Sequence, residues 1–178
     1  TRGEAVEIAL INDIAPLDIC AYLFQYDSTF GPFPHAVTHG DGTLSVLEQK
    51  IPFRHEADLT RVDLSGVDVV LDDGSHRMAH IEASLRVLYP LLAMNGTYMI
   101  EDLHTAYYPR FGGGFRAKEH FFNTVRKMID DMHTWYHNKD PLALPEMARQ
   151  VSGIHVHDSI VVLDKTPALR PTHSRVQK

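Results

Sequence analysis

The segment Val67-Asp-Val-Val-Leu-Asp-Asp-Gly-Ser-His76 decides how the second half of this 178-residue chain folds. It opens with a short, mostly apolar run, typical of a buried parallel strand, and an acidic pair ends that run. A helical pattern follows, with Ser75 placed to cap it. The spacing puts these apolar residues on one face: Met78, Ile81, Leu85, Leu88 and Leu92. A second apolar run, 96–100, ends in Glu101-Asp102, so strand, helix and strand alternate and predict an open α/β sheet.

Acidic residues gather at the ends of these two predicted strands. Ligands of open α/β sheets sit outside the carboxyl ends of the strands. Neighbouring strands lie roughly 4.8 Å apart, so the acidic pairs 72–73 and 101–102 would meet at one edge and repel each other. Mg²⁺, which prefers oxygen ligands, would resolve that repulsion. The sequence therefore predicts a magnesium site, with the alternative that these acids only cap helices and favour their dipoles.

His76 follows Asp73 by three positions, at the mouth of the same predicted helix. A neutral imidazole there could take a proton from a substrate hydroxyl that the metal has polarised. A histidine at the start of a surface helix is the ordinary alternative. The spacing alone does not decide between the two.

The rest of the second half predicts a glycine-rich loop, one long helix and a C-terminal antiparallel strand pair. The loop is 112–114, and the helix lies near 116–137. Its apolar stripe contains Phe122, Val125, Ile129, Met132 and Tyr136. The strand pair is 154–157 and 160–163, around Asp158-Ser159. The polar tail, 166–178, is expected to be flexible.

The first half predicts a short strand, a helix and an antiparallel hairpin insertion near 35–54. Residues 7–12 form an apolar run ending before Asp13, and Pro16 opens the helix. Four apolar residues of this helix recur at helical spacing: Leu17, Cys20, Leu23 and Phe24. We expect Cys20 to be buried in the core. Asp41-Gly42 predicts the hairpin turn, and 51–54 a third strand.

Composition narrows the class of protein. Apolar residues make up 44% and charged residues 22%, an ordinary globular mixture. A net charge of −6 argues against a nucleic-acid partner. The single cysteine fits a reducing cytoplasm, and no apolar run reaches the ~20 residues that a membrane span needs. We expect a cytoplasmic protein without a membrane partner; a homo-oligomer stays open.

Five spaced motifs run through the second half: Asp72-Asp-Gly-Ser-His76, Ile100-Glu-Asp-Leu-His-Thr-Ala-Tyr-Tyr108, Arg110-Phe-Gly-Gly-Gly114, Ile129-Asp-Asp-Met-His-Thr-Trp-Tyr136 and His157-Asp-Ser-Ile-Val-Val162. Together they resemble the macrolide-sugar and rhamnosyl O-methyltransferases, with which a group known as cephalosporin hydroxylases is related. The resemblance implies methyl transfer from S-adenosylmethionine to a sugar hydroxyl of a glycosylated natural product, as in antibiotic biosynthesis.

The same resemblance implies roles for individual residues. Those implied as Mg²⁺ ligands are Asp73, Glu101 and Asp102, and His76 is the implied catalytic base. Those implied on the substrate side are His104, Thr105 and Tyr107. For each of these last three, an ordinary polar loop is an equal alternative.

The first half resembles a different family. Ile11-Asn-Asp13, Tyr22-Leu-Phe-Gln-Tyr-Asp-Ser-Thr-Phe-Gly31 and Pro52-Phe-Arg54 are similar to part of the NAD-binding domain of glyceraldehyde-3-phosphate dehydrogenase. Asp13 matches the acid that binds ribose there, with a strand-end turn residue as the alternative. We assign Asp13 and Asp72, both at strand ends, to cofactor binding. NAD is the lesser alternative to S-adenosylmethionine.

These resemblances predict three segments: a partial dehydrogenase-like nucleotide-binding segment (1–66), a methyltransferase catalytic half (67–165) and the tail (166–178). The predicted fold class is α/β, a Rossmann-like doubly wound sheet. We expect it to be incomplete, because the first strand and glycine-rich loop of both families are missing. Beside a sugar O-methyltransferase, the alternatives are a non-catalytic chimera or truncated product, and an NAD-binding fragment.

Overall fold

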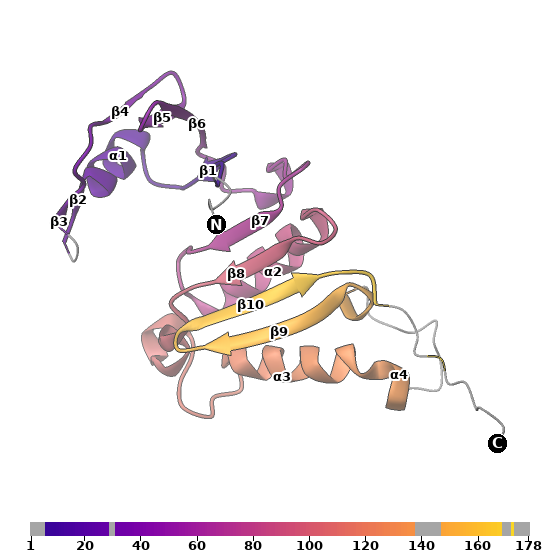
Figure 1. The fold of residues 1–178 in the computed structure, drawn as a ribbon. Helices are drawn as coiled ribbons and strands as arrows, with labels where there is room; N and C mark the ends of the chain where they lie inside the picture. Colours follow the sequence, from indigo (N-terminus) through magenta and orange to yellow (C-terminus); the bar gives the residue numbers. More distant parts are fainter. Residues whose placement is uncertain (1–5, 29–30, 138–146, 169–171, 173–178) are drawn as a thin grey trace. The chain divides into compact units, whose positions relative to one another are not determined.

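The computed structural model describes residues 6–28, 31–137, 147–168 and 172 (Figure 1). The chain divides into two compact units, Thr1–Val62 and Asp63–Lys178. Both contain strands and helices, so the fold is mixed α/β, as predicted. The predicted division was at 66/67, and the role of each segment stays a prediction. Most of the predicted tail lies outside the described residues.

The first unit is built on a four-stranded sheet in the order β1-β6-β5-β4. Its elements are β1 (Ile11–Asn12), α1 (Leu17–Gln25), β2 (Tyr26–Asp27), β3 (Gly31–Pro32), β4 (Val37–Gly40), β5 (Thr43–Val46), β6 (Gln49–Arg54) and the 3-10 turn η1 (Leu59–Arg61). β4, β5 and β6 pair antiparallel, which confirms the hairpin insertion. Asp41 and Gly42 both have positive φ, as a tight hairpin turn requires.

Two details of the first unit differ from the prediction. The strand predicted over residues 7–12 is reduced to Ile11–Asn12, which pairs parallel with the end of β6. On α1, Ala21 is the buried residue, whereas Leu23 and Phe24 are exposed and Cys20 is half-buried. Apolar spacing showed that a helix forms there, but a helix this short covers the sheet with only part of its apolar face.

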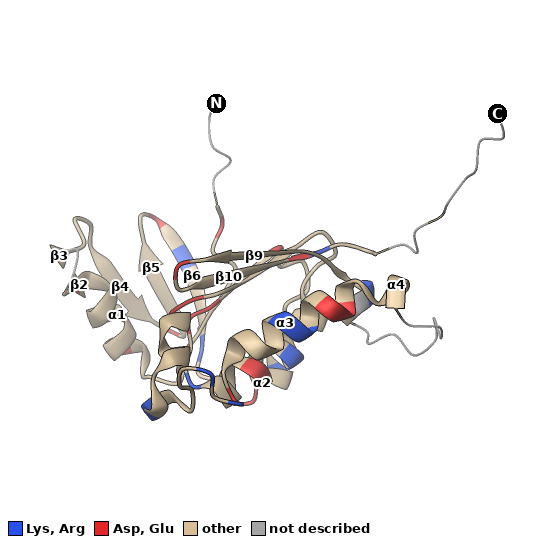
Figure 2. Ribbon diagram, turned by 90° about the horizontal axis from the view of Figure 1, so that it is seen from below, with Lys and Arg blue, Asp and Glu red and all other residues tan. Residues whose placement is uncertain are grey.

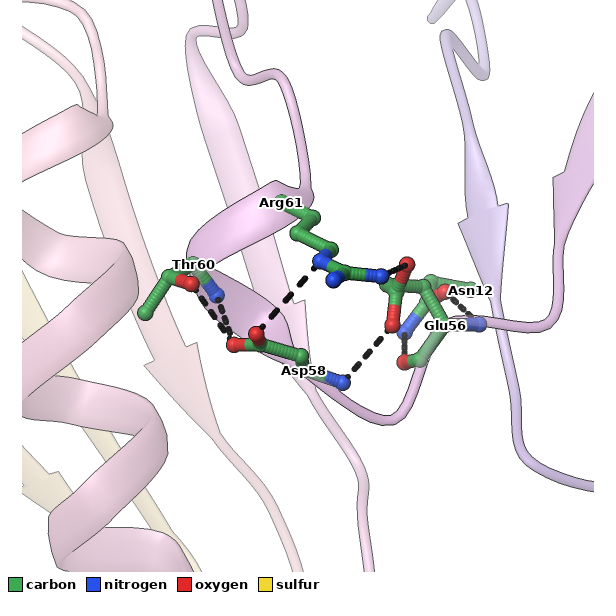
Figure 3. Close-up of polar contacts among 5 residues, drawn as sticks. All are labelled: Asn12, Glu56, Asp58, Thr60 and Arg61. Atoms are coloured by element: carbon green, nitrogen blue, oxygen red, sulfur yellow. Dashed lines mark hydrogen bonds and ion pairs between the residues drawn. The ribbon is translucent and has the colours of Figure 1, made fainter.

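A polar corner closes the first unit after β6 (Figure 3). The Asn12 side chain donates to the Glu56 carbonyl at 3.0 Å and accepts from the Glu56 N–H at 3.1 Å. This amide continues the β1–β6 pairing beyond the last strand residue. Asp58 accepts from the N–H and hydroxyl of Thr60 and so begins η1, while Arg61 lies 3.8 Å from Glu56 and 3.6 Å from Asp58. The exposed ion pairs add little stability compared with the backbone contacts.

The second unit contains the sheet β7-β8-β10-β9. Its elements are β7 (Val69–Asp72), α2 (Met78–Leu91), β8 (Thr97–Ile100), the 3-10 turns η2 (Leu103–Tyr107) and η3 (Pro109–Phe111), α3 (Phe121–Met132), α4 (Thr134–His137), η5 (Met147–Arg149), β9 (Val151–His157) and β10 (Ile160–Lys165). β7 and β8 are parallel, and β8, β10 and β9 are antiparallel. The C-terminal antiparallel strand pair is therefore confirmed.

Helices α2 and α3 lie along one side of this sheet (Figure 2). The sheet residues that face the core are Tyr98, Ile100, Val161 and Leu163, all fully buried. The predicted apolar face of α2 is the buried one, because all five of its predicted residues are at most 9% exposed. Of the predicted stripe of α3, Val125 is buried and Phe122 and Met132 are half-buried. The buried residues are Phe121, Val125 and Met128, whereas Ile129 and Tyr136 are exposed.

Lys165, at the end of β10, is a buried cation. Its ammonium donates to the carbonyl oxygens of Tyr89 at 3.0 Å, Pro90 at 2.9 Å and Leu92 at 2.6 Å. These carbonyls end α2, where the helix dipole is negative and no further N–H of the helix follows. The lysine therefore joins the end of the helix to the far end of β10. No helix in the described part of the chain is long and apolar enough to cross a membrane.

Candidate metal and proton-transfer site

The carboxyl ends of β7 and β8 lie side by side, as the strand–helix–strand pattern predicts. Asp72 pairs with Ile100 in the parallel register, and the Glu101 N–H donates to the Asp72 carbonyl at 3.1 Å. Asp73 and the Glu101-Asp102 pair therefore leave the sheet at the same edge. This short-range geometry follows from the sheet itself, since adjacent parallel strands end together.

Three side chains converge beyond that edge. Asp73, His76 and Asp102 each offer a ligand atom, and these atoms all lie within 4.8 Å of one another. His76 Nε2 is 3.8 Å from Asp102 Oδ2. Asp73 is exposed, whereas His76 and Asp102 are half-buried, so the cluster opens to solvent on one side. Two carboxylates and one imidazole suit a divalent cation that keeps open positions for water or substrate oxygens.

The backbone is strained at two members of this cluster. His76 has φ +56° and Asp102 has φ +55°, both in the left-handed region that non-glycine residues rarely adopt. The prediction that Ser75 caps α2 is wrong, because α2 begins at Met78 after Arg77 and has no side-chain cap. Ser75 Oγ instead lies 2.7 Å from His80 Nδ1. The turn at His76 therefore directs its imidazole towards Asp102 before the helix begins.

The remaining acids of the edge have different surroundings. Asp72 is half-buried and accepts a hydrogen bond from Tyr98 Oη at 2.8 Å. Burial raises the pKa of its carboxyl, and the Tyr98 hydrogen bond partly offsets that rise. Burial, with the nearby Asp73 and Asp102 charges, also raises the pKa of Glu101. Glu101 is thus close to the cluster electrostatically but is not one of its three converging members.

The residues predicted on the substrate side divide into three situations. His104 is exposed; its Nδ1 lies 2.8 Å from Ser159 Oγ and 3.7 Å from Asp102 Oδ1. Tyr107 is exposed and stacks edge-on against His120, with ring centroids 4.6 Å apart. Thr105 is buried, with its hydroxyl between two backbone carbonyls. The substrate role of all three stays a prediction.

Asp13, the other residue assigned to cofactor binding, belongs to the first unit. Its Oδ1 accepts from the Ala15 N–H at 2.7 Å, which closes a turn after β1. This contact is the strand-end turn that the sequence left open as an alternative. A ribose-binding role for Asp13 stays a prediction.

The sequence offered no role for several residues that surround the cluster. The tip of the β9–β10 hairpin supplies Ser159, whose carbonyl accepts from the Leu103 N–H at 2.9 Å and whose Oγ accepts from the His104 N–H at 3.2 Å. The Phe111 ring lies 6.4 Å from the His76 ring, and Tyr108 lies 5.9 Å from His104. Ser159, Phe111 and Tyr108 all belong to motifs that resemble those of the methyltransferases. That resemblance was the only feature of the sequence that pointed to them.

Comparison with known proteins separates the chain into two resemblances. The family model for the NAD-binding domain of glyceraldehyde 3-phosphate dehydrogenase matches residues 1–77. The dehydrogenase of Chlamydia muridarum is 41% identical over 68 residues, which are 38% of this chain and 20% of that enzyme. The 8-demethyl-8-(2-methoxy-alpha-L-rhamnosyl)-tetracenomycin-C 3'-O-methyltransferase of Streptomyces olivaceus is 36% identical over 103 residues. Each half resembles a different family.

The methyltransferase likeness extends to structure. The aligned region with the Streptomyces olivaceus enzyme is 55% of this chain but 26% of that protein, so the chain spans about a quarter of its length. The MycE methyltransferase from the mycinamycin biosynthetic pathway, solved in complex with Mg and SAH, matches with a TM-score of 0.52 and 33% identity. That match covers 56% of this chain and 26% of MycE. Both predicted resemblances are therefore confirmed.

Proposed function

We propose that the second unit is the metal-binding and proton-accepting part of an S-adenosylmethionine-dependent, Mg²⁺-assisted O-methyltransferase. Its substrate would be a sugar hydroxyl of a glycosylated natural product. The observation that carries this proposal is the convergence of Asp73, His76 and Asp102 beyond two parallel strand ends. The likeness to sugar O-methyltransferases supports the same assignment.

Asp73 and Asp102 would hold the cation, and Glu101 would complete the acidic surroundings. Bound Mg²⁺ would polarise the sugar hydroxyl and lower its pKa. His76, beside Asp102, would accept the hydroxyl proton on its imidazole. The Asp102 carboxylate would then stabilise the imidazolium charge. Bound S-adenosylmethionine would supply the methyl group: the sugar oxygen would bond to the methyl carbon as the carbon–sulfur bond breaks, with the sulfur keeping that electron pair.

Methyl transfer from radiolabelled S-adenosylmethionine tests this proposal directly, with methyl α-L-rhamnoside as acceptor. We expect transfer that requires Mg²⁺ and that His76→Ala slows by about 10²- to 10⁴-fold, as for loss of a general base. Asp73→Asn should abolish the Mg²⁺-dependent transfer, because it removes one of the two carboxylates that would hold the cation. Arg77→Ala, beside the base but outside the cluster, is the matched control and should keep wild-type activity. Mg²⁺-independent transfer, or an unaffected His76→Ala variant, would contradict the proposal.

The cofactor cradle is the finer part of the proposal. We infer that the sheet of the second unit belongs to a Rossmann-like sheet, with Asp72 on its cofactor side. Among the described residues, β7 has no strand paired on its other edge, where the first strand of such a sheet would lie. Asp72→Ala should therefore weaken S-adenosylmethionine binding when it is measured by calorimetry. Unchanged binding by this variant would overturn the assignment of Asp72 to the cofactor side.

The first half supports a second candidate, because the dehydrogenase family model matches residues 1–77. Under this alternative the chain is non-catalytic, or it binds NAD through Asp13. A fluorescence titration with NADH separates the candidates. Saturable binding that Asp13→Ala removes would favour a nucleotide-binding fragment. An absence of NADH binding together with Mg²⁺-dependent methyl transfer would favour the methyltransferase.

A further inference from the structure

Thr105 links the two strained residues of the cluster. It is 3% exposed, and its Oγ1 lies 2.6 Å from the Asp102 carbonyl oxygen and 3.2 Å from the His76 carbonyl oxygen. Its backbone N–H also donates to the Asp102 carbonyl at 3.0 Å. The hydroxyl carries one proton, so it donates to one carbonyl at a time, and the shorter contact is to Asp102.

The two contacts of this hydroxyl differ in kind. The bond to Asp102 spans three residues and is the local contact that threonines commonly make at the start of a helical turn. The contact to His76 spans 29 residues and joins the loop before α2 to the turn after β8. A local turn does not require that second contact. It is the feature that brings the two left-handed residues to one buried hydroxyl.

We propose that Thr105 is a positioning residue that holds His76 and Asp102 in their left-handed conformations and thereby sets the affinity of the site for a divalent cation. This inference rests on the proposed function. Left-handed backbone at two non-glycine residues persists only where the surroundings fix it. Without the hydroxyl, the Asp102 carbonyl keeps only the Thr105 N–H, and the His76 carbonyl loses its contact with this turn, so the His76 peptide group can turn towards ordinary φ values. The imidazole and carboxylate, now 3.8 Å apart at Nε2 and Oδ2, would then separate.

Thr105→Val tests this inference, because it keeps the shape of the side chain and removes the hydroxyl. Mn²⁺ serves as the probe, with its electron paramagnetic resonance signal reporting free and bound ion. We expect Thr105→Val to weaken Mn²⁺ binding by about tenfold to a hundredfold, the usual effect of losing a residue that orients metal ligands. Thr105→Ser, which restores the hydroxyl, should bind Mn²⁺ within about threefold of wild type.

Thr134→Val is the matched control. Thr134 is also buried, at 4% exposure, and its hydroxyl donates to the Asp131 carbonyl at 2.6 Å, three residues before it. The hydrogen bonds of this hydroxyl are local, to the Asp131 carbonyl and at 3.4 Å to the Asp130 carbonyl, and neither residue belongs to the cluster. This variant should lower the melting temperature about as much as Thr105→Val does and leave Mn²⁺ affinity unchanged.

The outcomes separate this inference from the proposed function. If the wild-type chain binds no Mn²⁺, the proposed metal site itself fails. If the wild type binds Mn²⁺ and Thr105→Val binds it equally well, the positioning role is overturned and the site stands. Equal weakening by Thr105→Ser would overturn it too, because the hydroxyl would not be the cause. Should Thr105→Val not fold, Thr105→Cys against Thr105→Ser gives the same comparison, with weaker binding expected for the thiol.

Discussion

Asp72 and Asp73 are neighbours in the chain with opposite surroundings. Asp73 is exposed and joins the cluster with His76 and Asp102. Asp72 is half-buried and receives the Tyr98 hydroxyl at 2.8 Å. Strand alternation is the reason, since consecutive side chains point to opposite faces. The Asp72 carboxylate therefore lies against Tyr98 at the end of β7, whereas the Asp73 carboxylate faces the cluster.

Tyr98→Phe should lower the free energy of unfolding by about 1–3 kcal/mol, because it removes the hydroxyl donor of a partly buried carboxylate and leaves it only the Gly74 N–H. Urea denaturation followed by circular dichroism measures the change. Tyr107→Phe is the control, since that hydroxyl belongs to an exposed side chain. Equal stability of Tyr98→Phe and wild type would show that water replaces the hydroxyl at Asp72.

His120 is a buried histidine that caps α3. Its Nδ1 accepts from the Phe122 N–H at 3.3 Å, so the cap requires a neutral imidazole. Burial lowers the pKa of His120, and the Arg126 charge lowers it further. The unfolded chain therefore binds this proton more readily than the folded chain does. The stability that His120 contributes is present above about pH 6.5, the ordinary value, and is lost as the pH falls below it.

The free energy of unfolding should consequently fall as the pH is lowered from about 7 to about 5. His120→Asn keeps a capping side chain that does not titrate. Urea denaturation of both proteins across this range should show a shallower pH dependence for the variant. The two proteins differ only at position 120, so the difference between their curves isolates His120. Parallel curves would exclude His120 as a cause of acid sensitivity.

At the scale of elements, two turns are packed so closely that only glycine fits. A Cβ on Gly113 would lie 2.0 Å from the Ala106 carbonyl oxygen, in η2. The Gly114 N–H donates to the same oxygen at 2.8 Å. The glycine-rich loop, predicted only as a loop, therefore fixes η2, the turn that carries Thr105. Its role follows from a backbone contact that no sequence pattern displays.

Gly113→Ala should lower the free energy of unfolding by about 1–3 kcal/mol or more, because backbone on both sides must shift. The fluorescence of Trp135, the single tryptophan, reports unfolding of the second unit. Gly40→Ala, where nothing lies within 4 Å of the added carbon, is the control. Gly40 belongs to the first unit, so the stability of this variant is measured by circular dichroism, and it should change little. Equal effects of the two substitutions would contradict the close packing of η2.

Some elements could be predicted because the local sequence pattern determines them. Others could not, because packing against distant segments determines them. Helix α2 has one apolar face, and that face is buried. Helix α3 has two overlapping apolar stripes that share Val125; packing against the sheet selects Phe121 and Met128 rather than Phe122 and Ile129. The convergence of the acids at the strand ends could be predicted, because a strand, a helix and a second strand follow one another along the chain and place both strand ends at one edge of the sheet. The positive φ values of His76 and Asp102 depend on Thr105, a contact between separate segments that the sequence could not reveal.

At the scale of the whole molecule, two compact units correspond to two resemblances. The division by contacts falls between Val62 and Asp63, and the dehydrogenase match ends at residue 77. β7 therefore belongs structurally to the second unit and lies within the first resemblance. Doubly wound sheets are built from parallel strands that are each followed by a crossover helix, and both families are expected to have such a sheet. One strand, β7, can therefore match the sequence pattern of either family.

Two compact units should unfold in two steps. Differential scanning calorimetry should resolve two transitions, with Trp135 fluorescence following only that of the second unit. Mg²⁺ at about 100 times its dissociation constant should stabilise the second unit by about 2.7 kcal/mol, and removing the ion with EDTA should reverse the shift. A single transition, or a Mg²⁺ shift in both, would contradict separate units with one metal site.

The Lys165 ammonium also fixes where α2 lies along its own axis. A slide of one residue, about 1.5 Å, would carry the Tyr89, Pro90 and Leu92 carbonyls out of register with the ammonium and leave a buried charge poorly solvated. The opposite end of the same helix follows directly on the His76 turn. A lysine on the last strand thus sets, through the whole length of a rigid helix, how far an imidazole reaches beyond the sheet edge.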